Sequence, residues 1–284
     1  MRSHPEPVGF AARYRAAVAE RGRLCAGIDP HAALLEQWGL PVSVDGLRAF
    51  GLACVEGLGP VAAVIKPQVA FFEAFGSGGF EVLEEVVAGC RAAGALVLAD
   101  AKRGDIGSTM AAYTTAWLDD ASPLCSDAVT VSPYLGFGAL EPAVAQARAA
   151  DRGVFVLART SNPEGAVLQT ALIQPGRAGT TVAQSIVDAA AAVNADGAGT
   201  VGVVVGATRE HGLDLSALAG PILSPGLGAQ GATPADLAAI FGGTTDLSWL
   251  LPAASRSILR AGPDATALAA ATAQTRDDIE SALR

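Results

Sequence analysis

Three ionisable side chains, Asp100, Lys102 and Asp105, stand close together in the segment LADAKRGDIGST (98–109). They follow an apolar run at 95–99 that has the composition of a buried strand. Residues two apart in an extended chain point to the same side, so Asp100 and Lys102 are expected to face each other. Such a pair can be a salt bridge that ties a strand to its loop, or a positioned ammonium that donates a proton. Taken alone, the pair favours the structural interpretation.

Polar residues also follow most of the other short apolar runs. Asp29 follows the first run in GIDP, and Lys66 follows the second in IKPQ. The later runs are followed by SPY (132–134), RTSNP (159–163), SPGLGAQG (224–231) and Ser255-Arg256. If the runs are strands of a closed barrel, all of these residues lie at one mouth, where barrel enzymes keep their active sites. Grouping Asp29 and Lys66 with the charged segment weakens the purely structural interpretation.

The segment SPGLGAQG has the features of a phosphate-binding loop. Its three glycines (226, 228 and 231) allow a tight turn that exposes backbone N–H groups, and a helix is expected to open at Pro234. Backbone donors beside a helix N-terminus attract phosphate, and Arg256 after the next run can add a bidentate contact. A plain glycine-rich turn is the alternative for the loop alone. The neighbouring Arg256 favours phosphate binding.

The elements that would position these residues alternate regularly along the chain. Helical patterns separate the apolar runs, and the runs are continuous, as in parallel strands covered on both faces. The pattern predicts an α/β protein with a (β/α)8 TIM barrel and an additional N-terminal helix carrying Phe10, Tyr14 and Val18, in one domain over 1–284; a doubly wound open sheet is the alternative. The expected strands are 24–28, 61–65, 95–99, 128–131, 154–158, 201–205, 221–223 and 248–251. Helices are expected from Phe80 to Cys90, from Met110 to Trp117 and over 180–194.

Composition excludes several classes of function. The net charge of -9 excludes a nucleic-acid-binding surface, and the N-terminus lacks the apolar region of a signal peptide. Apolar spans are too short to cross a membrane. The four cysteines form no CxxC pair, so we expect reduced thiols in a cytoplasmic protein. The three histidines are isolated, and neither GxGxxG after the first run nor GxxxxGK[ST] occurs, so no metal or nucleotide cofactor is expected.

The charged segment resembles the Asp-x-Lys-x-x-Asp signature of the orotidine 5'-phosphate decarboxylase family. The stretches IKPQVAFFE, TSNPEG and SPGLGAQG are also similar to that family, particularly to its longer bacterial (type 2) form. The similarity runs from Asp29 to Arg256. The signature alone is shared with related barrel enzymes that act on sugar phosphates, but its combination with the other stretches is specific.

The resemblance implies catalytic roles for the charged segment. Lys102 would donate the proton to C6 of the pyrimidine, and Asp100 would lie beside the substrate carboxylate and hold Lys102 in place. Asp105 would reach into the site of a neighbouring subunit, together with Ile106 and Thr109. The reaction implied is the decarboxylation of orotidine 5'-phosphate to UMP, the last step of UMP biosynthesis, by a homodimer with shared active sites and without a cofactor.

The resemblance also implies a set of substrate-binding residues. These are Asp29 and Lys66 for the ribose hydroxyls, Ser161 for the pyrimidine edge, Gln230 and Arg256 for the phosphate, and Pro225 and Gly228 in the same loop. Two alternatives stay open. One is a sugar-phosphate aldolase or epimerase with Mg²⁺ held by Asp100, which the neighbouring Lys66 disfavours because a cation repels a metal. The other is a non-catalytic sensor of uridine nucleotides, in which two carboxylates would only oppose binding of an anion.

Overall fold

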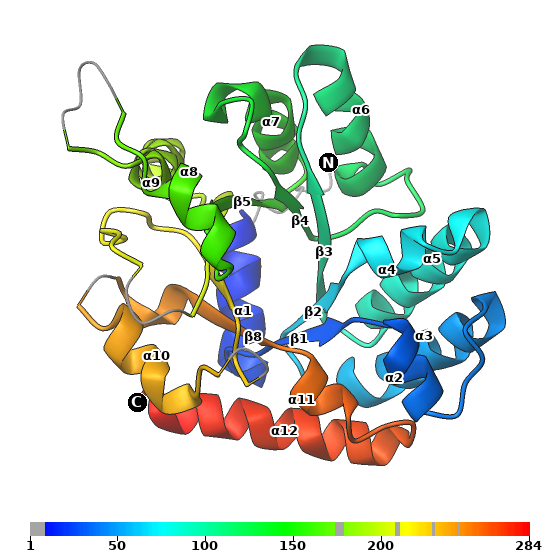
Figure 1. Ribbon diagram of the computed structural model, residues 1–284. Helices are drawn as coiled ribbons and strands as arrows, with labels where there is room; N and C mark the ends of the chain where they lie inside the picture. The colour runs from blue at the N-terminus through cyan, green and yellow to red at the C-terminus, as the bar shows by residue number, and fades with distance from the viewer. Residues whose placement is uncertain (1–8, 174–178, 208–210, 229–230, 244) are drawn as a thin grey trace, which may run out of the picture.

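Eight parallel strands form a closed barrel in which each strand pairs with the next along the chain (Figure 1). The computed structural model describes residues 9–173, 179–207, 211–228, 231–243 and 245–284. Pairing of Cys25 with Ala253 joins the first strand to the last and excludes an open sheet. The predicted TIM barrel is therefore confirmed. The strands are β1 (Cys25–Ile28), β2 (Val64–Pro67), β3 (Leu96–Arg103), β4 (Ala128–Val131), β5 (Gly153–Arg159), β6 (Val201–Val205), β7 (Ile222–Pro225) and β8 (Leu250–Ala254).

Helices surround the barrel and precede or follow each described strand (Figure 1). The α-helices are α1 (Phe10–Arg21), α2 (Ala32–Gln37), α3 (Val44–Leu58), α4 (Val69–Glu73), α5 (Gly76–Ala92), α6 (Gly107–Leu118), α7 (Glu141–Ala149), α8 (Ala166–Gln169), α9 (Val182–Asn194), α10 (Pro234–Phe241), α11 (Arg256–Leu259) and α12 (Ala265–Ala282). Three 3-10 helices are η1 (Phe137–Leu140), η2 (Pro163–Gly165) and η3 (Leu247–Trp249). The expected helices within 80–90 and 110–117 lie inside α5 and α6.

The strands carry two apolar faces, which explains why their sequences are continuous apolar runs. In β2 and β3, Val64 and Leu98 belong to a cluster inside the barrel, whereas Ile65 and Val97 belong to the larger cluster under the helices. Side chains of a strand alternate between its faces. The next inward positions after Val64 and Leu98 are Lys66 and Asp100, so the polar residues form the layer above an apolar barrel interior.

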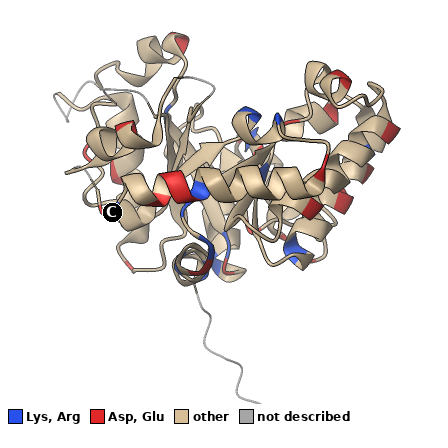
Figure 2. Cartoon of the chain, turned by 90° about the horizontal axis from the view of Figure 1, so that it is seen from below, with Lys and Arg blue, Asp and Glu red and all other residues tan. Residues whose placement is uncertain are grey.

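The N-terminal helix α1, whose existence the sequence predicted, packs against the amino end of the barrel. Its Tyr14 is fully buried in the interior cluster and stacks on Trp249 with 5.9 Å between ring centroids. Burial raises the pKa of the Tyr14 hydroxyl well above its ordinary value. Phe10 meets Phe155 of β5 edge-on, with centroids 6.2 Å apart. In the view from below, α1 is the helix seen end-on at the lower edge of the picture, where the described chain begins (Figure 2).

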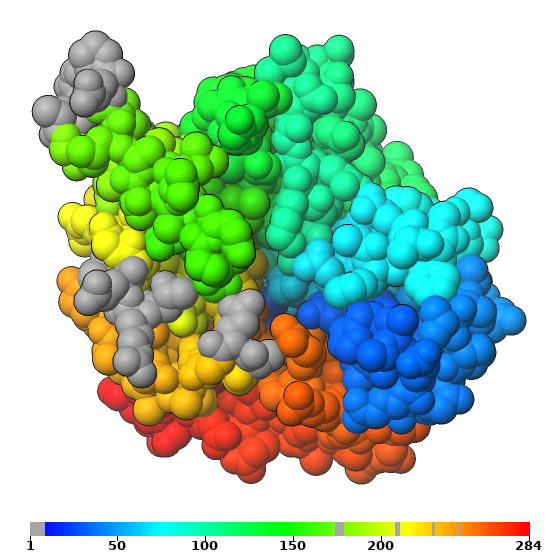
Figure 3. All heavy atoms as spheres, viewed as in Figure 1, coloured from blue at the N-terminus to red at the C-terminus, as the bar shows by residue number. Residues whose placement is uncertain are grey.

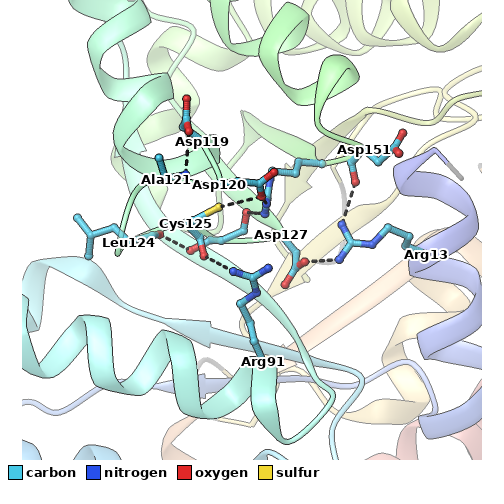
Figure 4. Close-up of polar contacts among 11 residues, drawn as sticks. Arg13, Arg91, Asp119, Asp120, Ala121, Leu124, Cys125, Asp127 and Asp151 are labelled. Carbon is cyan, nitrogen blue, oxygen red and sulfur yellow. Dashed lines mark hydrogen bonds and ion pairs between the residues drawn. The ribbon is translucent and has the colours of Figure 1, made fainter. Parts of the chain in front are cut away.

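A polar cluster fastens α1 to the barrel at this same end (Figure 4). Arg13 forms an ion pair with Asp127 and donates a hydrogen bond to the Asp151 carbonyl at 2.9 Å. The second Asp127 oxygen accepts the N–H of Val97 at 2.8 Å. The cluster therefore joins α1 to the starts of β3 and β4, and we interpret it as structural.

Several predicted strand boundaries were wrong by two or more residues, for identifiable local reasons. Residues 61–63 lie before β2 because the N–H groups of Val61 and Ala62 bond to the Leu58 carbonyl and extend the end of α3 as a turn. Residues 248–249 lie before β8 in η3, where the Asp246 carboxylate accepts the Ser248 N–H at 2.9 Å. Strands β3 and β7 run on to Arg103 and Pro225.

One helix boundary also differs from the prediction. The helix expected over 180–194 begins at Val182, because the Thr181 hydroxyl caps it by accepting the Gln184 N–H at 3.1 Å. Within the described ranges, no helix is both long enough and apolar enough to cross a bilayer.

Candidate active site

A cavity of about 310 Å³ lies at the carboxyl end of the barrel strands. In the space-filling view down the barrel, the surface is hollowed near the centre of this face (Figure 3). Residues of seven strands, or of the segments that directly follow them, line the cavity. Those that the sequence had singled out are Asp29, Lys66, Asp100, Lys102, Ser161, Pro225 and Arg256.

Asp100 is the hub of the hydrogen bonds in this cavity. Its Oδ2 accepts from Lys66 Nζ at 3.1 Å and from Gln68 Nε2 at 2.9 Å. Its Oδ1 accepts from Lys102 Nζ at 2.7 Å and from Thr130 Oγ1 at 2.8 Å. Each carboxylate oxygen therefore binds one ammonium and one neutral donor, which fixes the carboxylate plane.

The chain has only two lysines, and both of them bind Asp100. Lys66 is buried, whereas the Lys102 side chain is 46% exposed and reaches into the open part of the cavity. Burial opposes the charged form of both Lys66 and Asp100, but their mutual attraction is stronger. The pKa of Lys66 is consequently raised, and that of Asp100 is held well below its ordinary value by Lys66 and Lys102. Both groups are charged at neutral pH.

The backbone around Lys102 departs from the extended geometry expected from the sequence. Lys102 has a φ of 48°, in the left-handed region that residues with a Cβ rarely adopt. The register between β3 and β4 also shifts between Ala99 and Arg103. Asp100 and Lys102 do meet, but not because of simple strand alternation, and both lie within β3 rather than beyond its end. Pairing of their charges allows them to stay in the strand.

Asp29 offers an unpaired acceptor to the cavity. Its Oδ2 accepts from Ser255 Oγ at 2.6 Å, whereas its buried Oδ1 has no hydrogen-bond partner among the described residues. Ser255 approaches closely because Gly27 lies opposite: a Cβ on Gly27 would come within 2.8 Å of the Ser255 Cβ. A buried carboxylate oxygen without a partner is costly, so a ligand hydroxyl that donates to it would be bound favourably.

The glycine-rich loop after β7 brings Gly226 and Leu227 to the cavity wall. Gly226 has a φ of 115°, which a residue with a side chain could adopt only with strain. Gly228, also at positive φ, does not line the cavity; its N–H bonds to the Ala232 carbonyl at 2.8 Å and closes the turn. Gln230 lies outside the described residues. Helix α10 begins at Pro234 as predicted, but its N-terminus does not line the cavity.

Arg256 completes the cation set of the cavity. It is the first residue of α11, directly after β8, and its side chain is exposed. In the part of the chain that the structure describes, its guanidinium forms no hydrogen bond or ion pair. Three cations and two carboxylates line the cavity, so an anionic ligand balances the local charge.

Ser161, in the segment directly after β5, also lines the cavity. The preceding Thr160 is held by Gln169 of α8, whose Oε1 accepts the Thr160 N–H at 3.0 Å and whose Nε2 donates to Thr160 Oγ1 at 2.8 Å. Helix α8 thereby fixes the course of the chain that presents Ser161.

Asp105, Ile106 and Thr109 do not line the cavity of their own chain. Asp105 Oδ1 accepts the N–H of Ile106 at 2.8 Å, and the Ile106 side chain is 62% exposed. Thr109 is exposed on the first turns of α6. The structure therefore does not place these three residues in the wall of the cavity that Asp100 and Lys102 line.

Sequence reasoning missed three residues that complete the site: Gln68, Thr130 and Ser255. Gln68 stands two residues after Lys66, so alternation would have placed it on the same face. Thr130 is the polar exception in the run AVTV (128–131), at a position that points inward. Ser255 was noticed beside Arg256 but received no role. Within the described ranges, no three His, Cys, Asp or Glu side chains gather as a metal site.

Comparison with known proteins shows which family the chain resembles over nearly its whole length. Residues 22–271 match the model of the Orotidine 5'-phosphate decarboxylase / HUMPS family. An orotidine 5'-phosphate decarboxylase of Salinispora arenicola is 56% identical over 277 residues, covering 96% of this chain and 98% of the relative. One of Corynebacterium glutamicum is 53% identical over 275 residues, covering 95% and 97%. The crystal structure of a candidate orotidine 5'-phosphate decarboxylase of Streptomyces avermitilis superposes with a TM-score of 0.92 at 53% identity, covering 97% of this chain and 96% of that one.

Proposed function

The chain belongs to the Orotidine 5'-phosphate decarboxylase / HUMPS family, and from this membership and its site we propose that it converts orotidine 5'-phosphate to UMP and CO₂. The observation that carries the proposal is the Asp100 carboxylate held between the ammonium groups of Lys66 and Lys102 inside the cavity. That arrangement is charged before any ligand arrives, and it can stabilise negative charge that develops only during a reaction.

The cavity offers a separate group for each part of this substrate. Arg256, with the neighbouring glycine-rich loop, would bind the phosphate, and the unpaired Asp29 Oδ1 would accept a hydrogen bond from a ribose hydroxyl. Lys66 would contact the ribose, and Ser161 would contact the pyrimidine edge. The carboxylate on C6 would then lie beside Asp100 and Lys102. Gln230, Pro225 and Gly228 belong to the same proposed phosphate-binding region.

The proposed chemistry needs no group beyond these side chains. The C6–carboxylate bond breaks, CO₂ leaves, and the bonding electron pair stays on C6 as a carbanion. The Lys102 ammonium stabilises this charge and then donates a proton to C6, which gives UMP and a neutral lysine that regains its proton from solvent. Binding energy from the remote phosphate can support the step by orienting the pyrimidine over Lys102.

A metal-dependent reaction of a sugar phosphate fits the site less well. Both oxygens of Asp100 are already bound by an ammonium and a neutral donor. A Mg²⁺ ion on Asp100 would have to displace these donors and would lie against Lys66. A purely sensory role also leaves Asp100 unexplained, because a fixed carboxylate in the cavity repels an anionic ligand.

We predict that the purified protein consumes orotidine 5'-phosphate at the same rate with and without EDTA. The measurement is the absorbance change that accompanies conversion to UMP, followed with excess EDTA and then with added Mg²⁺. Loss of activity with EDTA and recovery with Mg²⁺ would favour the metal-dependent alternative. No consumption under any condition would contradict the proposed function.

We also propose that two copies of the chain form a homodimer with shared sites. Asp105, Ile106 and Thr109 do not line the cavity of their own chain, and the apolar side chains of Ile106, Tyr134 and Leu135 are exposed. Asp105 would supply the partner's site with a second carboxylate near the partner's Lys102, and Ile106 and Thr109 would lie in that site beside it.

A mixing experiment tests the shared site. Asp105→Asn and Lys102→Ala should each be nearly inactive as homodimers. After the two variants are dissociated and reassociated together, random pairing restores about a quarter of the sites, because one site of each heterodimer has both native residues. The decarboxylation rate of the mixture is compared with that of separately treated controls. A mixture that stays as inactive as its components would contradict sharing of Asp105.

Two broader expectations remain proposals. The four cysteines are free and buried, and burial raises the pKa of the Cys25 and Cys90 thiols to about 12. Unpaired, unreactive thiols are typical of the cytoplasm, which is where we propose that the protein works. We also propose that residues 1–284 act as one catalytic domain.

A further inference from the structure

Thr130 is a polar residue in the wall of the barrel, directly below the charged groups. It is fully buried on β4, between the apolar neighbours Val129 and Val131. Ala128 belongs to the cluster inside the barrel, so alternation also directs Thr130 inward. A threonine hydroxyl buried at this position needs hydrogen-bond partners, and the partners it has are both in the active site.

The Thr130 hydroxyl links the Asp100 side chain to the Lys102 main chain. Its Oγ1 donates to Asp100 Oδ1 at 2.8 Å and accepts the Lys102 N–H at 2.9 Å. The direction of both bonds follows from chemistry, because an ionised carboxylate can only accept and a backbone N–H can only donate. One hydroxyl therefore satisfies both groups at once.

The link coincides with the irregular part of β3. Lys102 has its φ of 48° where the register with β4 shifts. Its N–H is donated to a side chain of β4, and this bond supports a backbone conformation that a residue with a Cβ disfavours. The same conformation allows Lys102 Nζ to reach Asp100 Oδ1 at 2.7 Å.

We propose that Thr130 is a positioning residue for the decarboxylation: its hydroxyl holds Asp100 and the backbone of Lys102 so that the Lys102 ammonium points at the reacting carbon. The inference rests on the proposed function. Lys66 and Gln68 still hold Asp100 Oδ2 without Thr130, so loss of the hydroxyl should disturb the direction of Lys102 more than the position of Asp100. Loss of the Thr130 hydroxyl leaves the proposed substrate-binding groups, such as Arg256, unchanged.

The test compares Thr130→Val, which keeps the shape but removes the hydroxyl, with Thr130→Ser, which keeps the hydroxyl. For Thr130→Val we expect kcat to fall by about 10- to 100-fold, with KM for orotidine 5'-phosphate and Kd for UMP changing by less than about threefold. Thr130→Ser should keep kcat within about threefold of the wild type. If Thr130→Val does not fold, as judged by its thermal unfolding curve, Thr130→Ala takes its place.

Thr272→Val is the matched control. Thr272 is also fully buried, and its hydroxyl donates to the Leu268 carbonyl within α12, away from the cavity. It should lose stability at most, with kcat unchanged. Native kcat in the variant without the hydroxyl, equal losses in Thr130→Ser, or a rise in KM that matches the fall in kcat would each overturn the positioning role. An inactive wild type would instead overturn the proposed function, and this role with it.

Discussion

Lys102→Ala is expected to lower the rate of orotidine 5'-phosphate decarboxylation by at least about 10⁴-fold. The substitution removes both the charge that stabilises the C6 carbanion and the proton that quenches it. The fold should survive, because the Lys102 side chain is nearly half exposed and Asp100 keeps its bonds to Lys66, Gln68 and Thr130. The measurement is kcat at saturating substrate, with the thermal unfolding temperature as the check on folding.

Lys102→Arg separates the two roles of the ammonium. Arginine keeps a positive charge beside Asp100, but its high pKa makes it a very poor proton donor. We expect this variant to bind UMP with native-like affinity and still to lose at least about 10²-fold in kcat. A Lys102→Ala variant that turns over at a rate near that of the wild type would rule out the assignment of Lys102 as proton donor.

Arg256→Ala is expected to raise KM for orotidine 5'-phosphate by about 100-fold, with a smaller effect on kcat. The Arg256 guanidinium has no partner among the described residues and lines the cavity beside the glycine-rich loop, so its loss should not disturb other contacts. The effect should arise from the lost phosphate contact, since a bidentate contact between guanidinium and phosphate is worth a few kcal/mol.

The phosphate-free nucleoside orotidine provides the specificity control for Arg256. Wild type and Arg256→Ala should act on orotidine with similar, low kcat/KM, because neither can use a phosphate contact. Arg260→Ala is the matched variant, since Arg260 is an exposed arginine at the end of the same short helix but does not line the cavity. An unchanged KM in Arg256→Ala, or an equal rise in Arg260→Ala, would contradict the phosphate role of Arg256.

The barrel and the approximate place of the site could be predicted because they depend on patterns that recur along the chain. Eight continuous apolar runs predict strands buried on both faces, and the closure of such a barrel gathers Asp29, Lys66 and Asp100 whatever the details of the loops. The boundaries could not be predicted to the residue. Charged residues look like strand ends in a sequence, yet Lys66 and Asp100 neutralise each other and remain within β2 and β3.

The supporting hydrogen bonds were beyond sequence reasoning for a different reason. Thr130 can bond to Asp100 and Lys102 only because of the register of β4 against an irregular part of β3. The left-handed backbone conformation of Lys102 cannot be recognised from the sequence, because the residue is a lysine and not a glycine. Gln68 directly follows β2, and its backbone forms an isolated parallel β-bridge with that of Asp100. Its side-chain amide can therefore donate a hydrogen bond to the Asp100 carboxylate. Asp105 was predicted from resemblance alone to act in a partner's site, and its place outside its own cavity fits that proposal without testing it.

The most direct test of the central claim is product analysis by NMR after incubation of orotidine 5'-phosphate in D₂O with the wild type and with Lys102→Ala. The account predicts that the wild type forms UMP carrying deuterium at C6, with one CO₂ released per substrate, because the exchangeable Lys102 ammonium supplies the new atom. Lys102→Ala should leave the substrate unchanged over the same time. Unchanged substrate with the wild type, or deuterated UMP formed equally fast by Lys102→Ala, would contradict it.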